Sequence, residues 1–143
     1  MTSRRKKTRE VHTQADLHRH WHKLMGELGF SAPTLWIQFL TAGGQCLPVV
    51  PNIEDLPDRP EPVALANLMD LCAQVLRPDP GARVAFLRSR PGSSAMTGDD
   101  VAWARDLGSA AGEAGLRCEP VHLATDESIV VFAPDDLAWR DSA

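Results

Sequence analysis

Apolar residues recur at helical spacing in three parts of the chain. From Thr13 to Gly29 they form one stripe, and Thr13 with Asp16 has the spacing of a capping box at a helix start. A second helix is predicted to begin at Pro62, with this apolar face: Leu65, Leu68, Met69, Cys72, Val75 and Leu76. A third is predicted to begin after Thr97 and to stop at Gly115.

Short apolar runs bounded by Gly, Pro or acidic residues predict strands between these helices. The expected strands are residues 35–40, 46–50, 82–87, 119–124 and 128–132, and residues 134–140 are expected to add a helical turn. The first two strands are predicted to form a hairpin. Because Pro48 cannot donate to a ladder, the second strand should lie at an edge of the sheet or be bulged.

The order of these elements predicts the fold class. The order is helix, two strands, helix, strand, helix and two strands. This order favours an α/β domain in three layers, with a mixed β-sheet flanked by helices and an added N-terminal amphipathic helix. A chain of 143 residues with 43% hydrophobic content is enough for one core. We expect a basic arm at 1–12 and a single domain at 13–143. The Pro-rich acidic segment 51–62 is expected to be a surface loop, either a flap or a connector.

Charge and cysteine usage narrow the class of protein. The first ten residues carry five Lys or Arg and one Glu, which leaves a net charge of −8 on the rest of the chain. An acidic body is not typical of a protein whose whole face follows a phosphate backbone. No apolar run is long enough to span a membrane, so no membrane contact is expected. Three widely spaced cysteines without an apolar signal segment favour reduced thiols and a cytoplasmic location.

The basic arm has two interpretations. Arg4, Arg5, Lys6, Lys7 and Arg9 could make weak, nonspecific contact with nucleic acid, or they could simply keep the chain soluble. No aromatic platform or recognition motif accompanies the charge, which favours the second interpretation.

The junction between the strand at 82–87 and the third helix carries a motif. Arg88 and Arg90 are followed by Pro91, a short turn, Thr97 and Asp100. This junction resembles the signature of the JAB (MPN) domain family, particularly its RadC-like branch. There a strand ends in His-x-His-Pro, and a Ser and an Asp follow at the next helix. The turn is one residue shorter here, and the resemblance covers residues 34–133 as a JAB-like core, leaving the helix at 13–29 outside.

The resemblance implies a zinc site that this chain lacks. In the family two His and the Asp hold zinc, whereas Arg88 and Arg90 stand at the His positions and can only donate hydrogen bonds. The family's general-base Glu has no counterpart, since Glu27 lies a full segment earlier. We therefore expect no metal, no cofactor and no catalytic residues. A catalytically inactive member of the family, a pseudoenzyme, would act as a binding or scaffold module through a protein partner or a homodimer.

The degenerate site leaves alternatives open. Arg88, Arg90 and Thr97 could bind an anion where zinc would sit, or the arginines could pair with Asp99, Asp100 or the acidic loop, which we favour. Thr97 and Asp100 would then serve as helix-capping residues.

Two other functions compete with the binding module. One is a JAB-type hydrolase or peptidase that assembles a metal from atypical ligands such as His18, His22 and Asp100. The other is a DNA-associated accessory protein, suggested by the RadC-like resemblance and the basic arm.

The remaining candidate side chains favour structural roles. His18 and His22 lie one helical turn apart and could share a metal, with Asp16 or Glu27 as a third ligand, but with His12 and His20 they are more typical of a solvated helix face. His122 is expected to be half-buried and structural. The cysteines are expected to be small core residues. Ser93 and Ser94 have no neighbouring His as a base, so a nucleophilic mechanism finds no support.

Overall fold

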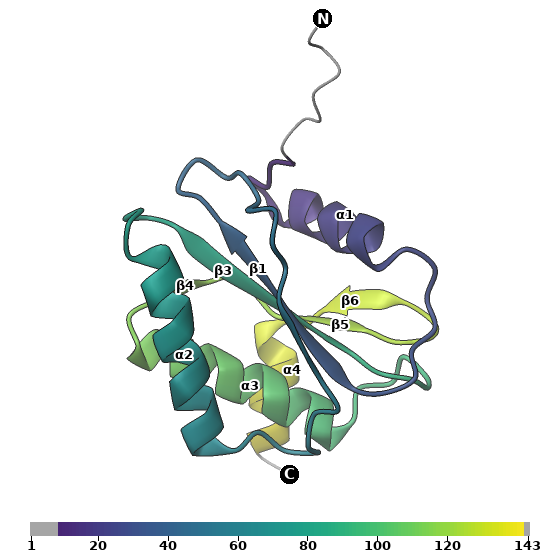
Figure 1. Cartoon of the computed structure of the whole chain (residues 1–143). Helices are drawn as coiled ribbons and strands as arrows, with labels where there is room; N and C mark the ends of the chain where they lie inside the picture. Colours follow the sequence, from purple (N-terminus) through teal and green to yellow (C-terminus); the bar gives the residue numbers. More distant parts are fainter. Residues whose placement is uncertain (1–8, 142–143) are drawn as a thin grey trace, which may run out of the picture.

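The structure is a computed structural model that describes the backbone of residues 9–141 and the side chains of residues 9–137. Within this part of the chain, one mixed sheet lies between helices (Figure 1). The elements are α1 (Gln14–Met25), β1 (Thr34–Leu40), β2 (Asn52–Glu54), α2 (Pro62–Leu76), β3 (Arg83–Ser89), α3 (Gly98–Glu113), β4 (Arg117–Cys118), β5 (His122–Ala124), β6 (Ile129–Val131) and α4 (Pro134–Asp141).

The sheet is built around β3. Its strand order is β2-β1-β3-β5-β6, and β4 pairs with the start of β3 off this path. β3 runs parallel to β4 and β5 and antiparallel to β1, so a helix crossover (α3) connects it to its parallel neighbours. In the long β1–β3 register, Leu35 faces Arg88 and Phe39 faces Val84.

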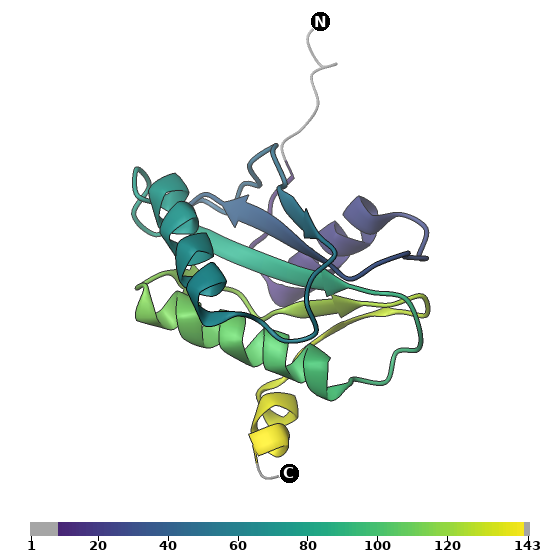
Figure 2. The same cartoon turned by 60° about the horizontal axis from the view of Figure 1, so that its bottom comes forward.

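Helices cover both faces of the sheet. Figure 2 shows α1 on one side of the strands, α2 and α3 on the other, and α4 below α3. Alternate β3 side chains enter two cores: Val84 and Phe86 pack towards α2 and α3, and Ala85 and Leu87 pack towards α1 around Trp21. The predicted α/β class, with a mixed sheet flanked by helices and an N-terminal helix, is confirmed.

Local capping chemistry places the helix starts where the sequence predicts them. Thr13 and Asp16 form a complete capping box on α1, and Thr97 and Asp100 form another on α3. α2 has Pro62 at its first position, and the Glu61 side chain accepts from the N–H of Ala64. The first helix ends at Gly26, earlier than the predicted Gly29, because Gly26 takes a positive φ of 66°.

The predicted hairpin partner at 46–50 is wrong in its position. Only Cys46 makes a bridge, to Leu40, and the regular edge strand is β2 at Asn52–Glu54. Pro48 and Pro51 have no N–H to donate, so they interrupt the ladder between Cys46 and β2. The edge position expected for Pro48 agrees with this. The segment 51–62 is therefore an edge strand followed by a loop, rather than a loop throughout.

The N-terminal boundary of the domain is also earlier than expected. The N–H of Cys46 donates to the carbonyl of Arg9, Glu10 bridges Gln45, and the Val11 side chain is fully buried, so residues 9–12 belong to the fold rather than to the arm. Arg4, Arg5, Lys6 and Lys7 lie outside the described residues.

Two smaller elements differ from the prediction. β4 is too short for its pattern to be detected, and α4 has two turns rather than one. None of the helices described here has the length and apolar character needed to cross a membrane.

Candidate functional site

The end of β3 and the start of α3 bring the four motif residues together. Arg88 follows Val84 and Phe86 on the same side of β3, so its side chain enters the space under α3. Arg90 leaves the strand two residues later in the same direction. Asp100 lies in the first turn of α3, where the capping box with Thr97 turns its carboxylate back towards both arginines.

Asp100 is the centre of this group and is completely buried, with 0% of its side chain exposed. Its Oδ1 accepts from Arg88 Nε at 2.9 Å and from Arg90 Nε at 2.9 Å. Its Oδ2 accepts from Arg90 Nη2 at 2.7 Å and from the backbone N–H of Thr97 at 2.9 Å. We call Arg88, Arg90 and Asp100 the buried ion-pair cluster. Of the three partners that the sequence left open, Asp99, Asp100 and the acidic loop, Asp100 is the one that both arginines bind.

Arg90 also organises the turn that follows it. Its Nη1 donates to the carbonyls of Pro91 and Ser93, and its Nη2 donates to the carbonyl of Ala95. Each of its guanidinium nitrogens therefore has an acceptor. Arg90 acts as a fixed internal part of the turn and keeps no donor for an external anion.

The turn is held from its other side by the β5–β6 connection. Asp126 accepts from the N–H groups of Gly92 and Phe30, and Glu127 accepts from the N–H of Ser94. These backbone hydrogen bonds lower the pKa of Asp126 below its ordinary value, that from Gly92 most strongly. Nothing in the sequence around Asp126 and Glu127 shows that their carboxylates face a distant loop.

The pKa of Asp100 reflects two opposed effects. Burial by itself would raise the pKa of this carboxyl group, because it disfavours the charged form. Hydrogen bonds from Arg90, from the backbone of Thr97 and from Arg88 outweigh burial and lower the pKa of Asp100 below its usual 3.8. The hydrogen bond to Asp100 also raises the pKa of Arg90. Asp100 is therefore ionised at neutral pH.

Arg88 is the one member with a donor left over. Its side chain is 5% exposed and lies 6.0 Å from the centre of the Trp103 ring, a cation–π distance. Its Nη1 is buried without a hydrogen-bond partner. The two N–H groups of this nitrogen are the donors that an anion here could bind; anion binding stays a prediction, and internal pairing with Asp100 is the observed arrangement.

The acidic loop is fastened to the same helix. Arg59 donates to Asp99 at 2.7 Å, and the indole N–H of Trp103 donates to the carbonyl of Pro57 at 3.0 Å. Asp99 therefore pairs with the loop rather than with the arginines of β3. The loop is a connector that closes over the start of α3.

The residues present do not fit the zinc ion that the family resemblance implies. Arginine supplies no lone pair to a cation, and both Asp100 oxygens already accept hydrogen bonds from the arginines or the backbone. Among the side chains that the structure describes, no three His, Cys, Asp or Glu lie together in a group that could hold a metal ion.

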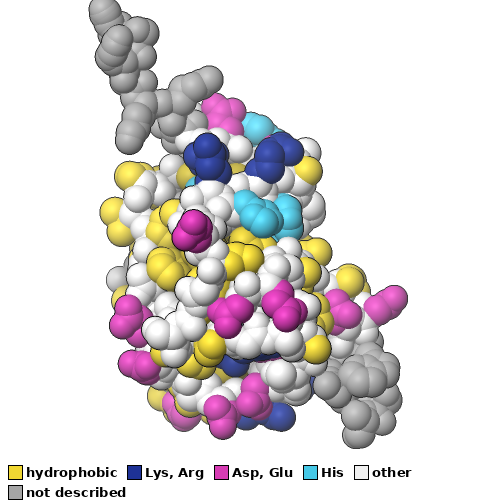
Figure 3. Space-filling view, turned by 90° about the vertical axis from the view of Figure 1, so that its right-hand side faces the viewer, with side chains coloured by type: hydrophobic (Ala, Val, Ile, Leu, Met, Phe, Trp, Pro, Cys, Tyr) yellow, Lys and Arg dark blue, Asp and Glu magenta, His cyan; other side chains and the backbone are white. Residues whose placement is uncertain are grey.

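The three side chains of the atypical ligand set, His18, His22 and Asp100, lie on opposite faces of the sheet. The His18 ring lies 4.7 Å from the His22 ring and 5.9 Å from the His122 ring, centre to centre, on the face covered by α1. Asp100 lies on the face covered by α3. One ion could therefore not bind His18, His22 and Asp100 together, and a hydrolase with other ligands stays a prediction. Figure 3 shows histidine side chains reaching the surface near Lys and Arg side chains, with most acidic side chains further towards the other end.

Two histidines differ from the predicted solvated or half-buried positions. His20 is buried and its Nε2 lies 2.7 Å from the side-chain oxygen of Gln38 on β1. Its spacing from Leu17 and Trp21 could have shown that it shares their stripe. His122 is fully buried rather than half-buried, and its Nδ1 has no partner. Burial lowers the pKa of His122 to about 4, with a smaller contribution from His18.

The surroundings of the cysteines keep their side chains as unreactive thiols. Cys46 and Cys72 are buried, Cys118 is half-buried, and none forms a disulfide. Burial raises the pKa of Cys72 to about 11 and that of Cys118 to about 12, so both are thiols at neutral pH. The prediction of small core residues is confirmed for Cys46 and Cys72.

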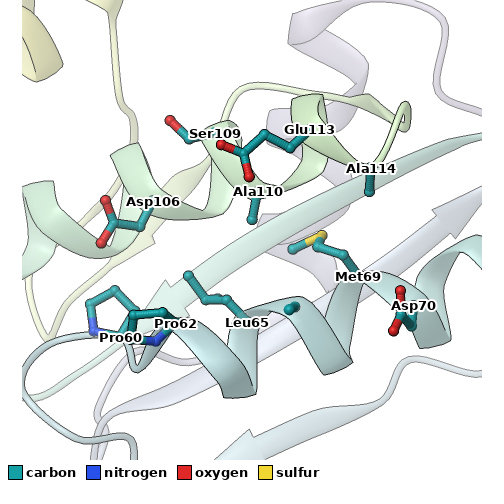
Figure 4. Close-up of a pocket in the computed structure, with 11 residues that line it drawn as sticks. Pro60, Pro62, Leu65, Met69, Asp70, Asp106, Ser109, Ala110, Glu113 and Ala114 are labelled. Atoms are coloured by element: carbon teal, nitrogen blue, oxygen red, sulfur yellow. The ribbon is translucent and has the colours of Figure 1, made fainter.

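A groove of about 400 Å³ lies between α2 and α3. Figure 4 shows Leu65 and Met69 of α2 pointing towards α3, with the carboxylates of Asp106 and Glu113 on the opposite wall. The lining residues include no His, Cys or Lys. The groove has an apolar floor and acidic walls.

Comparison of the chain with protein-family models and with curated proteins gave no match.

Proposed function

We propose that this protein is a catalytically inactive relative of the RadC-like JAB domains that acts as a binding or scaffold module. The observation that carries the proposal is the state of Asp100. It stands at the family's last ligand position, yet its two oxygens are bound by Arg88, Arg90 and the N–H of Thr97. An ion pair then takes the place that a metal would have between β3 and α3.

The chemistry of the cluster supports the absence of metal-dependent hydrolysis. A hydrolytic zinc needs about three protein ligands and an open position for water. Here the two residues that would supply imidazole nitrogens supply fixed positive charges, which repel a cation. Conversion of a ligand site into an internal salt bridge keeps the strand–helix junction rigid and removes its chemistry.

The free cysteines support a cytoplasmic location, which we propose together with this function. None of the three forms a disulfide, and a reducing compartment would keep them so.

Restoring the ligands tests the proposal directly. The double variant Arg88→His, Arg90→His places two imidazoles beside Asp100, because both arginine Nε atoms lie 2.9 Å from its Oδ1. We expect the variant to bind zinc at one ion per chain and to melt at a higher temperature with zinc than with a chelator. The wild-type protein should show neither effect.

A matched variant controls for histidines placed anywhere on the surface. Arg59→His, Arg77→His adds two histidines at exposed positions beyond opposite ends of α2 and should not gain zinc affinity. A folded double variant at 88 and 90 that takes up no more zinc than this control would refute the resemblance on which the proposal depends.

A further inference from the structure

Two adjoining hollows lie between α2 and α3, and their charges are opposite. The groove of about 400 Å³ has Asp70 of α2 and Glu113 of α3 on its walls, with no Lys or Arg in its lining. A second hollow of about 320 Å³ has Arg77 and Arg117 on its walls. It begins where the groove ends, because residue 114 lines the groove and residue 115 lines the hollow. We call the two hollows together the bipolar groove, with an acidic end and a basic end.

The charges of the bipolar groove are not neutralised by side chains that the structure describes. Four charged residues on its walls are exposed and make no ion pair with any described side chain: Asp70, Glu113, Arg77 and Arg117. Most other described arginines, by contrast, pair with a carboxylate. Asp79, which also lines the basic end, accepts from a backbone N–H of another loop. The groove is therefore complementary to a ligand that carries a positive and a negative group in the reverse order.

Small side chains leave the bipolar groove open between its two ends. Four alanines line it, two from each helix: Ala66, Ala73, Ala110 and Ala114. Below them Leu65 and Met69 form an apolar floor, with both side chains pointing towards α3 (Figure 4). Apolar side chains of a partner can enter such a space, since small residues on both walls let the partner approach closely.

The walls favour a helix over an extended peptide as the occupant. The backbone groups of α2 and α3 are hydrogen-bonded within each helix, so they offer few partners to an extended strand. A helix satisfies its own backbone and needs only an apolar groove and charges at its rim. Both α2 and α3 run from the acidic end to the basic end. A third helix therefore has its dipole opposed to both when it runs the other way.

We propose that the bipolar groove binds an amphipathic helix of a partner protein, which runs antiparallel to α2 and α3. The first turn of the partner helix carries Asp or Glu beside Arg77 and Arg117. Two turns later, a Lys or Arg of the partner faces Asp70 and Glu113. The spacing agrees, because Asp70 and Arg77 are seven residues apart, about 10.5 Å along a helix axis and about two turns.

This charge order also suits the partner helix itself. Acidic residues in the first turn and basic residues near the end of a helix are stabilised by its dipole. The inference depends on the proposed binding function and names the surface through which that function acts. The occupant is a different protein rather than a second copy, and the oligomeric state distinguishes the two.

Fluorescence anisotropy with two synthetic peptides tests the proposal on the full chain. The matched peptide has about 16 residues, long enough for a helix to form. It carries a glutamate in its first turn, leucines at alternating intervals of three and four residues, and a lysine seven residues after the glutamate. The exchanged peptide has the same composition with the glutamate and the lysine interchanged. We expect the matched peptide to bind about 10-fold more tightly, because the exchanged peptide meets like charges at both ends.

Charge reversal in the groove should invert this preference. Arg77→Glu should weaken binding of the matched peptide about fivefold, and the double variant Arg77→Glu, Glu113→Lys should prefer the exchanged peptide. Lys23→Glu makes the same change of charge at an exposed position of α1, on the other face of the sheet, and should leave the preference unchanged. Circular dichroism and the melting temperature show that each variant is folded.

Three results would overturn the proposal. The first is equal binding, or no binding, of the two peptides to the wild-type chain. The second is a preference that the double variant leaves unchanged. The third is a dimer in sedimentation equilibrium that Arg77→Glu dissociates, since a second copy would then fill the groove. Zinc analysis is a separate readout: a zinc-binding chain that still prefers the matched peptide would refute the proposed function and leave this inference standing.

Discussion

Replacing Asp100 by Asn should destabilise the protein more than any other single polar substitution at the β3–α3 junction. The change keeps the shape of the side chain and removes the charge that faces both arginines. Arg88 is 5% exposed and Arg90 is 11% exposed, so both charges are largely shielded from water. Removing one partner of a buried ion pair costs about 3–5 kcal/mol, since the other charge stays buried and unpaired.

That free energy can be read as a melting temperature. For a chain of this length, about 1 kcal/mol corresponds to about 3 °C, so Asp100→Asn should lower the melting temperature by about 10–15 °C at neutral pH. Because the pKa of Asp100 is lowered in the fold, its contribution is present above the unfolded value near 3.8 and is lost as the pH falls through the folded pKa. The difference between variant and wild type should therefore stay constant above about pH 5 and shrink below pH 4.

The neighbouring carboxylate provides the control. Asp99 pairs with Arg59 in an exposed bridge, so Asp99→Asn should cost less than about 1 kcal/mol. Calorimetry of both variants from pH 3 to pH 7 checks the reasoning. If Asp100→Asn melted within about 3 °C of the wild type, the cluster would not hold the junction together, and the account of the site would be refuted.

Three further substitutions test other parts of the structure. Thr97→Ala removes the cap of α3 and should lower the free energy of unfolding in urea by about 1 kcal/mol, well below the loss for Asp100→Asn. An equal loss would mean that capping accounts for the effect of Asp100 as well as ion pairing does. Trp21→Ala leaves a cavity in the core under α1 and should lower the free energy of unfolding by about 3–5 kcal/mol. An unchanged stability would show that α1 is not packed on the sheet. Because His122 has a pKa of about 4 in the fold and 6.5 when unfolded, its neutral form contributes about 3 kcal/mol above pH 6.5, most of which is lost by pH 4. His122→Leu should flatten this decline in thermal unfolding, and an equally steep decline would show that His122 is not its source.

The parts of the fold that depend on local chemistry could be predicted from the sequence. Thr13, Thr97 and Pro62 mark helix starts through contacts within one turn, and the structure begins its helices there. The second strand could not be placed, because its position depends on how Pro48 and Pro51 meet the edge of β1. The shorter arm also escaped prediction, since Val11 is held by hydrogen bonds with Gly44 and Arg83, which are distant in sequence.

The candidate site shows the same division. Arg88 and Arg90 are two residues apart on a strand, so the sequence could predict that they share a face and meet the first turn of α3. It could not show that one carboxylate binds both, nor that Asp126 accepts from the turn, because these contacts depend on the twist of the sheet. The burial of His20 could have been predicted from its place beside Leu17 and Trp21, whereas its partner Gln38 could not, because Gln38 lies on another element.

The zinc content of the purified wild-type protein, measured by mass spectrometry after incubation with zinc and dialysis, tests the central claim most directly. The buried ion-pair cluster predicts zinc far below one ion per chain and a melting temperature that neither zinc nor a chelator changes. One tightly bound zinc per chain, lost on substitution of Asp100, would show that the carboxylate is a ligand and would contradict the account.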